Sequence, residues 1–356
     1  MQNLSIAIIA GDGIGREVIQ PAFEIAREAA SDAGASLEAV PYDWGSDYFF
    51  QHGRMMPSDA LETLRRHDAI LLGAVGHPKI PDNVTLNGLL LPIRRRFDQF
   101  ANVRPAILYS GIESPLRGLN GSDIDLVVVR ENTEGEYAQA GGFVHETHQQ
   151  EVAVQTSVFT RHGIERIVRY AFDLARRRGG KRKVTSITKS NAQGFSMVLW
   201  DRVFQKVASE YSDIETESLL VDAAAMNFVR RPQSFDVVVA SNLFGDILSD
   251  LSAIVAGSIG LAASANINPS RHFPSMFEPV HGSAPDIAGK GIANPLAAIF
   301  SAAMMLDHLG LTNPAARIDQ AVRIVLAEGR FRTPDLGGTS STRDVVRAVR
   351  DALTSS

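Results

Sequence analysis

The sequence contains no cysteine, no surplus of basic residues and no long apolar run. Without cysteine the chain forms no disulfide, thiolate metal site or Fe–S cluster, and it has no cysteine nucleophile. Its 35 Lys and Arg against 40 Asp and Glu give a formal charge of -5, which supplies no broad basic field for nucleic acid or anionic lipid. No apolar run approaches the ~20 residues that a membrane-spanning helix requires, and the N-terminus lacks the basic region of a signal peptide. These features predict a cytoplasmic protein that binds neither nucleic acid nor membranes.

Short strand-like segments alternate with longer helical ones along the 356 residues, a length that suggests two domains. The strand-like segments are rich in β-branched residues and apolar on both faces, and they span residues 4–10, 69–72, 124–129, 183–187 and 235–240. Segments of 3.6-residue periodicity span residues 17–30, 164–177, 192–211 and 295–309. This alternation predicts an α/β fold.

Residues 134–156 depart from the alternation, because Gly141-Gly142 stands between partly alternating flanks. The pattern predicts a hairpin or a protruding arm. Such an arm is either a plain surface hairpin or a clasp that packs on a second subunit, and periodicity alone leaves both open.

A glycine-rich turn, Gly11-Asp-Gly13-Ile-Gly15, follows the first strand and precedes a helix. A dinucleotide-binding fingerprint needs its third glycine three residues after the second, but Arg16 stands there. We therefore interpret the turn as a tight strand-to-helix connection that uses glycine for its positive φ angles.

Two aspartates, Asp246 and Asp250, lie four residues apart in the segment that follows residues 235–240, so both carboxylates project from one face of a helix. Like charges at this spacing repel, and a hard divalent cation such as Mg²⁺ or Mn²⁺ would offset the repulsion. The alternative, stabilisation of the helix dipole, explains Asp246 better than Asp250. Asp222 is a candidate third ligand, although its position before an alanine-rich stretch is also typical of a helix N-cap.

Several arginines are candidates for binding a small di-acid. Arg104 and Arg130 each close a short apolar run, and arginines at the ends of neighbouring strands can bind carboxylates in bidentate geometry. Residues 94–96 are three consecutive arginines. The helix expected there turns its apolar side inward, so at most one or two of these arginines point away from solvent.

Lys189 and Tyr137 are candidates for moving protons. Lys189 stands at a strand-to-helix junction, where beside a cation and arginines it would act as a general base; a surface lysine is the alternative. Tyr137 could donate a proton to an enolate, although a lone tyrosine more often serves packing.

The stretch 277–295 is rich in turn formers and small residues, yet it carries charged side chains and a histidine. This composition is typical of a ligand-binding loop rather than of a linker. An acidic residue such as Asp286 suits ribose hydroxyls and would repel a 2′-phosphate.

The chain resembles the β-decarboxylating dehydrogenases, the family that includes isopropylmalate, isocitrate, homoisocitrate and tartrate/D-malate dehydrogenases, and it is most similar to the tartrate/D-malate branch. The likeness runs from the Gly11 loop to Thr333-Pro-Asp-Leu-Gly-Gly338. It is carried by Arg94, Arg104 and Arg130-Glu-Asn-Thr-Glu-Gly, by Asn242-Leu-Phe-Gly-Asp-Ile-Leu-Ser-Asp250, and by Glu278-Pro-Val-His-Gly-Ser-Ala-Pro-Asp286.

The resemblance implies a role for each candidate. Arg94, Arg104 and Arg130 would hold the carboxylates of a 2-hydroxy di-acid, with Leu90 lining an apolar part of the pocket. Asp246 and Asp250 would bind Mg²⁺ or Mn²⁺ together with Asp222 of the partner subunit. Lys189 of the partner subunit would take the hydroxyl proton, and Tyr137 would protonate the enolate after CO₂ leaves. The NAD-binding residues would be Glu278, His281, Gly282, Ser283, Ala284, Asp286, Ile287 and Asn294.

The resemblance also implies two α/β domains of the isopropylmalate-dehydrogenase type, with a large mixed sheet flanked by helices, and not a classical Rossmann fold. Residues 1–98 and 256–356 would form a discontinuous cofactor-binding domain. Residues 99–255 would form the dimerisation and substrate domain, with an arm near 134–156. The active unit would be a homodimer with a shared site; activation by K⁺ stays open.

The substrate expected is a malate-like 2-hydroxy di-acid of the D-malate or tartrate type, oxidised by NAD and decarboxylated. Isocitrate enzymes bind the γ-carboxylate with a Ser and an Asn where this chain has Gly88 and Leu90, so isocitrate is disfavoured. The tartrate/D-malate branch has Trp where this chain has Asn87, which keeps 3-isopropylmalate as the alternative. Two more distant alternatives are a metal-dependent hydrolase and a non-catalytic regulatory subunit.

Overall fold

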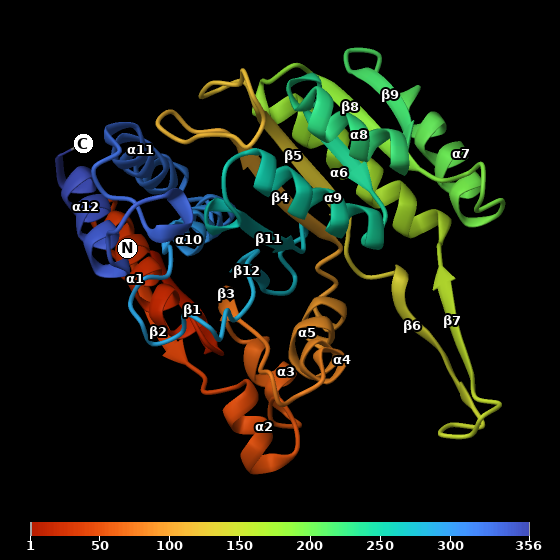
Figure 1. The fold of residues 1–356 in the computed structure, drawn as a ribbon, viewed down its shortest axis with the longest axis horizontal. Helices are drawn as coiled ribbons and strands as arrows, with labels where there is room; N and C mark the ends of the chain where they lie inside the picture. Colours follow the sequence, from red (N-terminus) through yellow and green to blue (C-terminus); the bar gives the residue numbers. More distant parts are fainter. Residues whose placement is uncertain (1, 356) are drawn as a thin grey trace. The chain divides into compact units, whose positions relative to one another are not determined.

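Ten strands form one mixed sheet within residues 2–355, the part of the chain that the computed structural model describes (Figure 1). The strands are β1 (Gln2–Gly11), β2 (Ala35–Pro41), β3 (Ala69–Ala74), β4 (Ala101–Ile107), β5 (Asp125–Glu131), β8 (Lys183–Thr188), β9 (Glu215–Leu220), β10 (Val237–Ala240), β11 (Ala263–Ile267) and β12 (Ser275–Pro279). Their order across the sheet is β2-β1-β3-β12-β11-β4-β5-β10-β8-β9. β1 pairs in parallel with β2 and β3, whereas β11 pairs antiparallel with β12. The predicted mixed sheet is thus confirmed.

The helices alternate with these strands along the chain. They are α1 (Gly15–Asp32), α2 (Ser46–His52), α3 (Ala60–Leu64), α4 (Asp82–Thr85), α5 (Leu91–Arg96), α6 (Arg161–Arg178), α7 (Ser196–Ala208), α8 (Val221–Arg230), α9 (Asn242–Val255), α10 (Leu296–His308), α11 (Thr312–Glu328) and α12 (Thr342–Ser355). A π-helical turn, η1 (Leu86–Leu90), joins α4 to α5. The strands and helices predicted from periodicity are confirmed, although α7 starts later than expected because residues 192 and 193 form a turn on the Lys189 carbonyl. Within residues 2–355 no helix is both long and apolar enough to cross a membrane.

The chain divides into two compact units. Unit 1 comprises Met1–Gln99, Arg104–Ile124 and Ala253–Ser356, and unit 2 comprises Phe100–Val103 and Asp125–Ser252.

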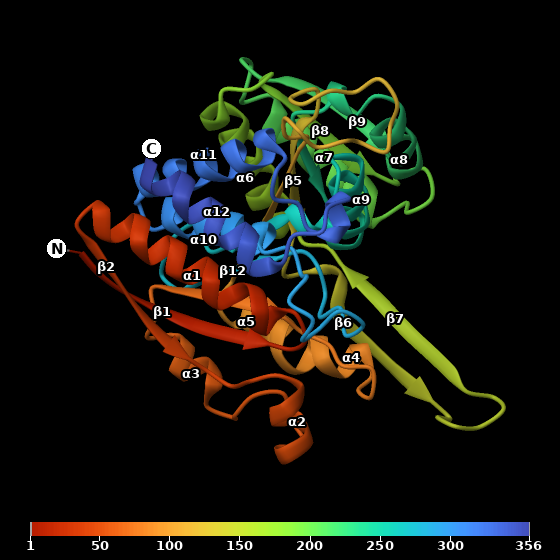
Figure 2. The ribbon, with the colours of Figure 1, turned by 60° about the vertical axis from the view of Figure 1, so that its left-hand side comes forward.

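In unit 1, alternating side chains of β1 and β3 form cores on both faces of the sheet. Ala7, Ile9, Ile70 and Leu72 are buried in one cluster with apolar residues of α3 and α5. The alternate residues of the strands face the other way, where α1 packs against α10 and β3. Figure 2 shows α1 and α10 along one face of β1, with α3 on the other.

In unit 2, β10 pairs in parallel with β5 and β8, and β8 pairs in parallel with β9. Parallel strands end at the same edge of a sheet, which is where open α/β sheets place their functional groups. Arg130 lies near the end of β5, Lys189 follows β8 and Asn242 follows β10, so these side chains come from one edge.

The predicted arm is a hairpin of β6 (Gly135–Val144) and β7 (Val152–Val158). The turn does not lie at Gly141-Gly142, as the glycine pair suggests, but between the strands at residues 145–151. Gly141 belongs to β6, where a Cβ atom would lie 2.0 Å from the Val154 carbonyl oxygen. The glycine therefore permits close strand pairing instead of a turn.

Candidate active site

The aspartates predicted to bind a metal both lie on α9. Asp246 is the fifth residue of this helix and Asp250 the ninth, so their side chains share one helical face. The Asp246 side chain is 30% exposed. Carboxylate oxygens on one face match the ligand preference of Mg²⁺ and Mn²⁺. Among the described residues no three His, Cys, Asp or Glu side chains gather as a metal-binding cluster within one chain.

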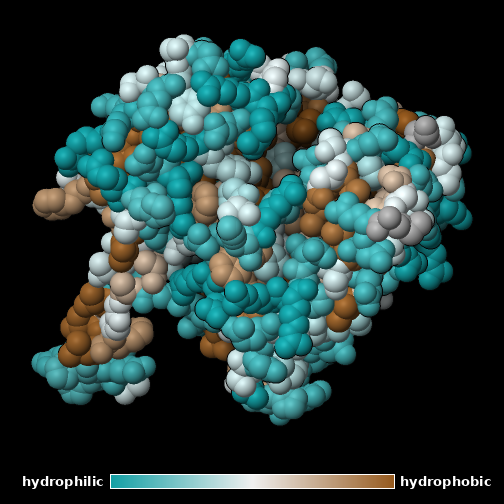
Figure 3. Space-filling model, turned by 180° about the vertical axis from the view of Figure 1, so that it is seen from behind, coloured by the Kyte–Doolittle hydropathy of each residue, from teal (hydrophilic) through white to brown (hydrophobic). Residues whose placement is uncertain are grey.

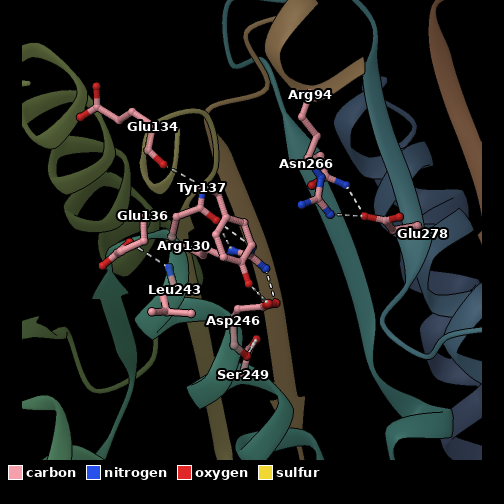
Figure 4. A network of polar contacts seen from close by, with 11 residues as sticks. Arg94, Arg130, Glu134, Glu136, Tyr137, Leu243, Asp246, Ser249, Asn266 and Glu278 are labelled. Atoms are coloured by element: carbon pink, nitrogen blue, oxygen red, sulfur yellow. Dashed lines mark hydrogen bonds and ion pairs between the residues drawn. The ribbon is translucent and has the colours of Figure 1, made fainter. Parts of the chain in front are cut away.

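Arg130 is almost fully buried and points from β5 to the start of α9 (Figure 4). Its Nε and Nη2 atoms donate to Asn242 Oδ1 at 2.9 and 2.7 Å, and its Nη1 pairs with Asp246 Oδ1. Gly245 makes this approach possible, since a Cβ atom there would lie 2.6 Å from Arg130 Cβ. In the Asn-Leu-Phe-Gly-Asp motif, the asparagine and the aspartate thus bind one arginine, and the glycine leaves room for its side chain.

Tyr137, on the first residues of β6, lies beside the same pair. Its hydroxyl donates to Asp246 Oδ2 at 2.9 Å, and Arg130 Cζ lies 5.2 Å from the ring centroid. A phenol proton donor, a guanidinium and a candidate metal ligand therefore meet in unit 2.

Lys189 and Asp222 form a second pair in unit 2, with 2.5 Å between Lys189 Nζ and Asp222 Oδ1. The hydrogen bond from Lys189 lowers the pKa of the Asp222 carboxyl. Asp222 is not a helix N-cap, because Leu220 is the cap of α8 and Asp222 lies in the first turn. The pair is accessible, with side-chain exposures of 29% and 58%.

Arg94, the first predicted substrate arginine, is buried in unit 1. Its Nη2 donates to Glu278 Oε1 at 2.7 Å, and the same oxygen accepts from Asn266 Nδ2 at 2.8 Å. Its Nε is buried without a hydrogen-bond partner among residues 2–355, which leaves a donor for a ligand. The other two arginines of the triplet are more exposed than Arg94, as the helical pattern predicts.

The remaining substrate candidates also belong to unit 1. Arg104 is a buried residue of β4, and Leu90 is the last residue of the π-helical turn, half-buried against the core cluster below β1 and β3. π-helical turns are rare and occur frequently at functional sites. The turn here immediately precedes the helix that carries Arg94.

The loop after β12 is held by the glycine-rich turn rather than by regular structure. Ile14 donates its backbone N–H to the Ser283 carbonyl at 2.9 Å, and a Cβ atom on Gly13 would lie 2.0 Å from that oxygen. Glu17 accepts backbone N–H groups from Gly289 and Gly291. The φ angles of +68° at Gly11 and +50° at Gly13 confirm a tight strand-to-helix turn.

Residues of this loop line a cavity of about 650 Å³ together with the segment 75–82. Gly282 and Ser283 lie in its wall, next to Ala284, whose φ angle of +40° is rare for a residue with a side chain. Further along, Asp286 is exposed and Ile287 half-buried. The volume is in the range of small-molecule and cofactor sites.

His281 and Asn294 flank the exposed part of the loop and are both buried. Burial lowers the pKa of His281, so the imidazole is neutral at pH 7, and its Nε2 has no hydrogen-bond partner among the described residues. Asn294 donates to Asp335 Oδ2 at 2.9 Å and accepts the Leu296 backbone N–H at 3.0 Å. An unpartnered ring nitrogen and a fixed carboxamide are groups that a polar cofactor could use.

Four polar residues that the sequence did not single out take part in these networks. Asn242 and Asn266 orient the arginine–carboxylate pairs, Asp335 holds Asn294, and Glu136 binds the start of α9. Asn266 and Asn242 could have been noticed as amides within or directly after buried apolar strands, since an amide buried there needs a partner. Asp335 and Glu136 carry no comparable local signal.

Comparison with known proteins finds decarboxylating dehydrogenases that are similar to this chain over nearly its whole length. The family model described as isocitrate/isopropylmalate dehydrogenase matches residues 5–349. A tartrate dehydrogenase/decarboxylase of Pseudomonas putida is 50% identical, covering 99% of this chain and 98% of the relative. A D-malate dehydrogenase (decarboxylating) of Escherichia coli is 49% identical, covering 98% of each. The crystal structure of isocitrate dehydrogenase from Methylococcus capsulatus matches with a TM-score of 0.89 and 40% identity over 99% of each chain.

Proposed function

The chain belongs to the isocitrate/isopropylmalate dehydrogenase family, as its motifs predict, and from this premise we propose that it oxidatively decarboxylates a malate-like 2-hydroxy di-acid, D-malate or tartrate, with NAD and Mg²⁺ or Mn²⁺. Its relatives are decarboxylating dehydrogenases, and the chain is accordingly an oxidoreductase. The observation that carries the proposal is the meeting of Arg130, Asp246 and Tyr137, which combines a carboxylate binder, a cation ligand and a proton donor.

Each residue of this network has a defined task in the proposed reaction. Arg130 binds a substrate carboxylate with the planar guanidinium that Asn242 orients. Lys189 of the partner subunit takes the proton of the C2 hydroxyl as hydride leaves C2. Tyr137 then gives its phenol proton to C3 of the enolate that remains after CO₂ departs. Asp246 and Asp250 would hold the divalent cation, which when bound polarises the C2 oxygen and stabilises the enolate.

The loop at residues 280–294 is proposed to bind NAD, which would accept the hydride. The cavity beside Gly282 and Ser283, the free ring nitrogen of His281 and the exposed Asp286 carboxylate fit a dinucleotide with unmodified ribose hydroxyls. Glu278 precedes this loop and its Oε1 is engaged by Arg94 and Asn266. We therefore propose that it contributes to the site through Arg94.

The π-helical turn supports a short, polar substrate. A Cβ atom on Gly88 would lie 2.5 Å from Cγ of the buried Met55, so the serine that isocitrate enzymes use there has no room. Asn87 Oδ1 is buried without a hydrogen-bond partner in the described chain, and it could accept a hydroxyl of the substrate. An unsatisfied amide oxygen disfavours the isopropyl group of 3-isopropylmalate.

The arm and the Lys189–Asp222 pair support a homodimer. Exposed apolar side chains gather on the arm, where Figure 3 shows them as brown atoms; they are Phe143, Val144, Val152, Val154 and Val158. A patch of this kind usually marks an interaction site. Lys189 and Asp222, which pair with each other, are accessible to a second copy and could serve its site.

A substrate panel tests the proposal. NADH formation from D-malate, L- and D-tartrate, 3-isopropylmalate and isocitrate is followed with Mn²⁺ present. We expect the highest kcat/KM for D-malate or a tartrate; turnover of 3-isopropylmalate with negligible rates for those two would refute the substrate choice. In the Lys189→Ala variant turnover should fall by about 10²- to 10⁴-fold, the range for loss of a general base, and intact turnover would refute its role.

A further inference from the structure

Glu136, the residue before Tyr137, binds the start of α9 with both carboxylate oxygens. Its Oε1 accepts from Ser241 Oγ at 2.8 Å, and its Oε2 accepts the backbone N–H of Leu243 at 3.1 Å. Leu243 is the second residue of α9, so the carboxylate lies at the positive end of the helix dipole (Figure 4). The root of the arm is thereby fixed to the helix that carries Asp246.

Two further contacts bring the arm root close to the same helix. Asn242 Nδ2 donates to the Glu134 carbonyl at 3.0 Å. Gly135 has a φ angle of +77°, and a Cβ atom there would lie 3.3 Å from Asn242 Cβ. The Tyr137 hydroxyl then reaches Asp246, one helical turn beyond Leu243.

Glu134 offers an internal comparison, because it anchors the same loop to a different helix. Its carboxylate accepts the backbone N–H and the hydroxyl of Thr160, the N-cap of α6, at 2.9 and 2.8 Å. Two carboxylates separated only by Gly135 thus hold the arm root on α6 and on α9. Of these two carboxylates, Glu136 is the one that binds the helix that Tyr137 touches.

Among the described residues of one subunit, β6 pairs only with β7, and all residues of β7 are exposed. A two-stranded hairpin is marginally stable by itself, so within one subunit the direction in which Tyr137 points depends on the contacts that Glu136 makes with Ser241 and Leu243.

We propose that Glu136 is a positioning residue, which holds the Tyr137 hydroxyl at Asp246 by tying the arm root to the N-terminus of α9. The proposal rests on the proton-donor role proposed above for Tyr137. A proton donor must lie within hydrogen-bond reach of the reacting atom, so a loosened arm root would lower the rate of protonation while leaving substrate binding by Arg130 in place.

The position of Tyr137 can be measured without turnover. The full-length protein labelled with 3-fluorotyrosine is studied by ¹⁹F NMR, and among the six tyrosines Tyr137 is assigned as the resonance that the Tyr137→Phe variant lacks. Glu136→Ala should shift or broaden this resonance and leave the others in place. Glu136→Gln keeps an oxygen for Leu243 and should restore it, whereas Glu134→Ala is the matched control and should not move it.

An unmoved Tyr137 resonance in folded Glu136→Ala protein overturns the proposal. If Glu136→Ala does not fold, Glu136→Asp is used in its place. The shorter aspartate side chain reaches at most one of the two donors, so a Tyr137 resonance identical to that of the wild type would also overturn the proposal.

A double-mutant cycle tests whether Glu136 acts through Tyr137. Glu136→Ala should lower kcat by about tenfold with little change in KM. If it acts through Tyr137, the Glu136→Ala/Tyr137→Phe protein is no slower than Tyr137→Phe alone, whereas multiplying effects contradict the proposal. Wild-type turnover in Tyr137→Phe would instead refute the proton-donor role, and the NMR result would still decide whether Glu136 positions Tyr137.

Discussion

Two buried arginines, Arg130 in unit 2 and Arg94 in unit 1, form similar ion pairs with different consequences. Both side chains are almost fully buried, at 2% and 4% exposure, and an asparagine takes part in each network. The carboxylates differ: Asp246 is 30% exposed, whereas Glu278 is 10% exposed. The exposed carboxylate can exchange its partner for a ligand, while the enclosed one keeps an arginine in one orientation.

The elements that carry the two carboxylates account for this difference. Asp246 lies on the first turns of α9, beside the arm, and its second oxygen accepts the Tyr137 hydroxyl. Glu278 lies on β12, inside the sheet of unit 1, and Asn266 on the paired strand β11 donates to it. A buried ion pair is weak evidence for stability in itself, but removing one partner is strongly destabilising. Substitution should therefore affect chemistry at Asp246 and structure at Glu278.

The largest effect is expected for Asp246→Asn. The loss of one proposed cation ligand should lower kcat/KM by at least about a hundredfold, corresponding to several kcal/mol of charge stabilisation. Mn²⁺ titration by calorimetry should show weakened binding. Unchanged Mn²⁺ affinity would remove Asp246 from the metal site and with it the contrast to Glu278.

The second effect concerns the arm, on which the unit 2 network depends through Tyr137. Phe143→Asp places a charge in the apolar patch of the arm, where the native side chain is 63% exposed. If a second copy covers the patch, sedimentation velocity should show a shift from dimer to monomer, and activity should fall steeply on dilution. Phe50→Ser, which changes an exposed phenylalanine of α2, is the control and should leave the assembly unchanged. A wild-type protein that sediments as a monomer at all concentrations would contradict the proposed dimer.

Much of the local architecture could be predicted from the sequence. The five strand-like segments correspond to β1, β3, β5, β8 and β10, because a buried parallel strand leaves a continuous apolar run. The spacing of Asp246 and Asp250 correctly predicted that both lie on one helical face, because this prediction depends only on the geometry of a helix. The departure of Gly11-Asp-Gly13-Ile-Gly15 from the dinucleotide fingerprint excluded a Rossmann turn, and the turn instead supports the loop at Ser283.

The partners within the site could not be predicted, because they are distant in the sequence. Arg94 meets Glu278 across 184 positions and Glu136 meets Leu243 across 107. Local periodicity contains no information on which side chains a folded sheet brings together. The role of helix N-cap suggested for Asp222 was wrong. Leu220 ends β9 and is itself the N-cap, so α8 already begins at Val221.

The third effect is expected for Glu278→Gln, which leaves the Arg94 charge buried without a counter-charge. Loss of one partner of an enclosed pair should lower the free energy of unfolding by about 3 kcal/mol. If Glu278 acts through Arg94, KM for the di-acid should rise about tenfold, and the Kd for NAD should stay unchanged.

The control for this variant is Arg96→Gln, which breaks the Arg96–Glu62 pair at 50% and 57% exposure and should cause no measurable loss of stability. A weakened NAD affinity with an unchanged di-acid KM would show instead that Glu278 contacts the cofactor, as the sequence motif alone suggests.

The smallest effect concerns His308, on α10, whose ring lies 5.6 Å from that of Phe277, the residue before Glu278. Burial, and to a lesser extent the positive charge of Arg271, lowers the pKa of His308 to about 4. The ordinary value of about 6.5 applies to the unfolded chain, so between these values the unfolded state binds more protons. The stabilising contribution of the neutral His308 is fully present above pH 6.5 and is lost as the pH falls toward 4. At pH 5 the part already lost amounts to about 2 kcal/mol. Urea unfolding at pH 7.5 and pH 5.0 should therefore show a smaller loss of stability for His308→Gln than for the wild type. An equal loss in both would mean that groups other than His308 set the acid sensitivity of unit 1.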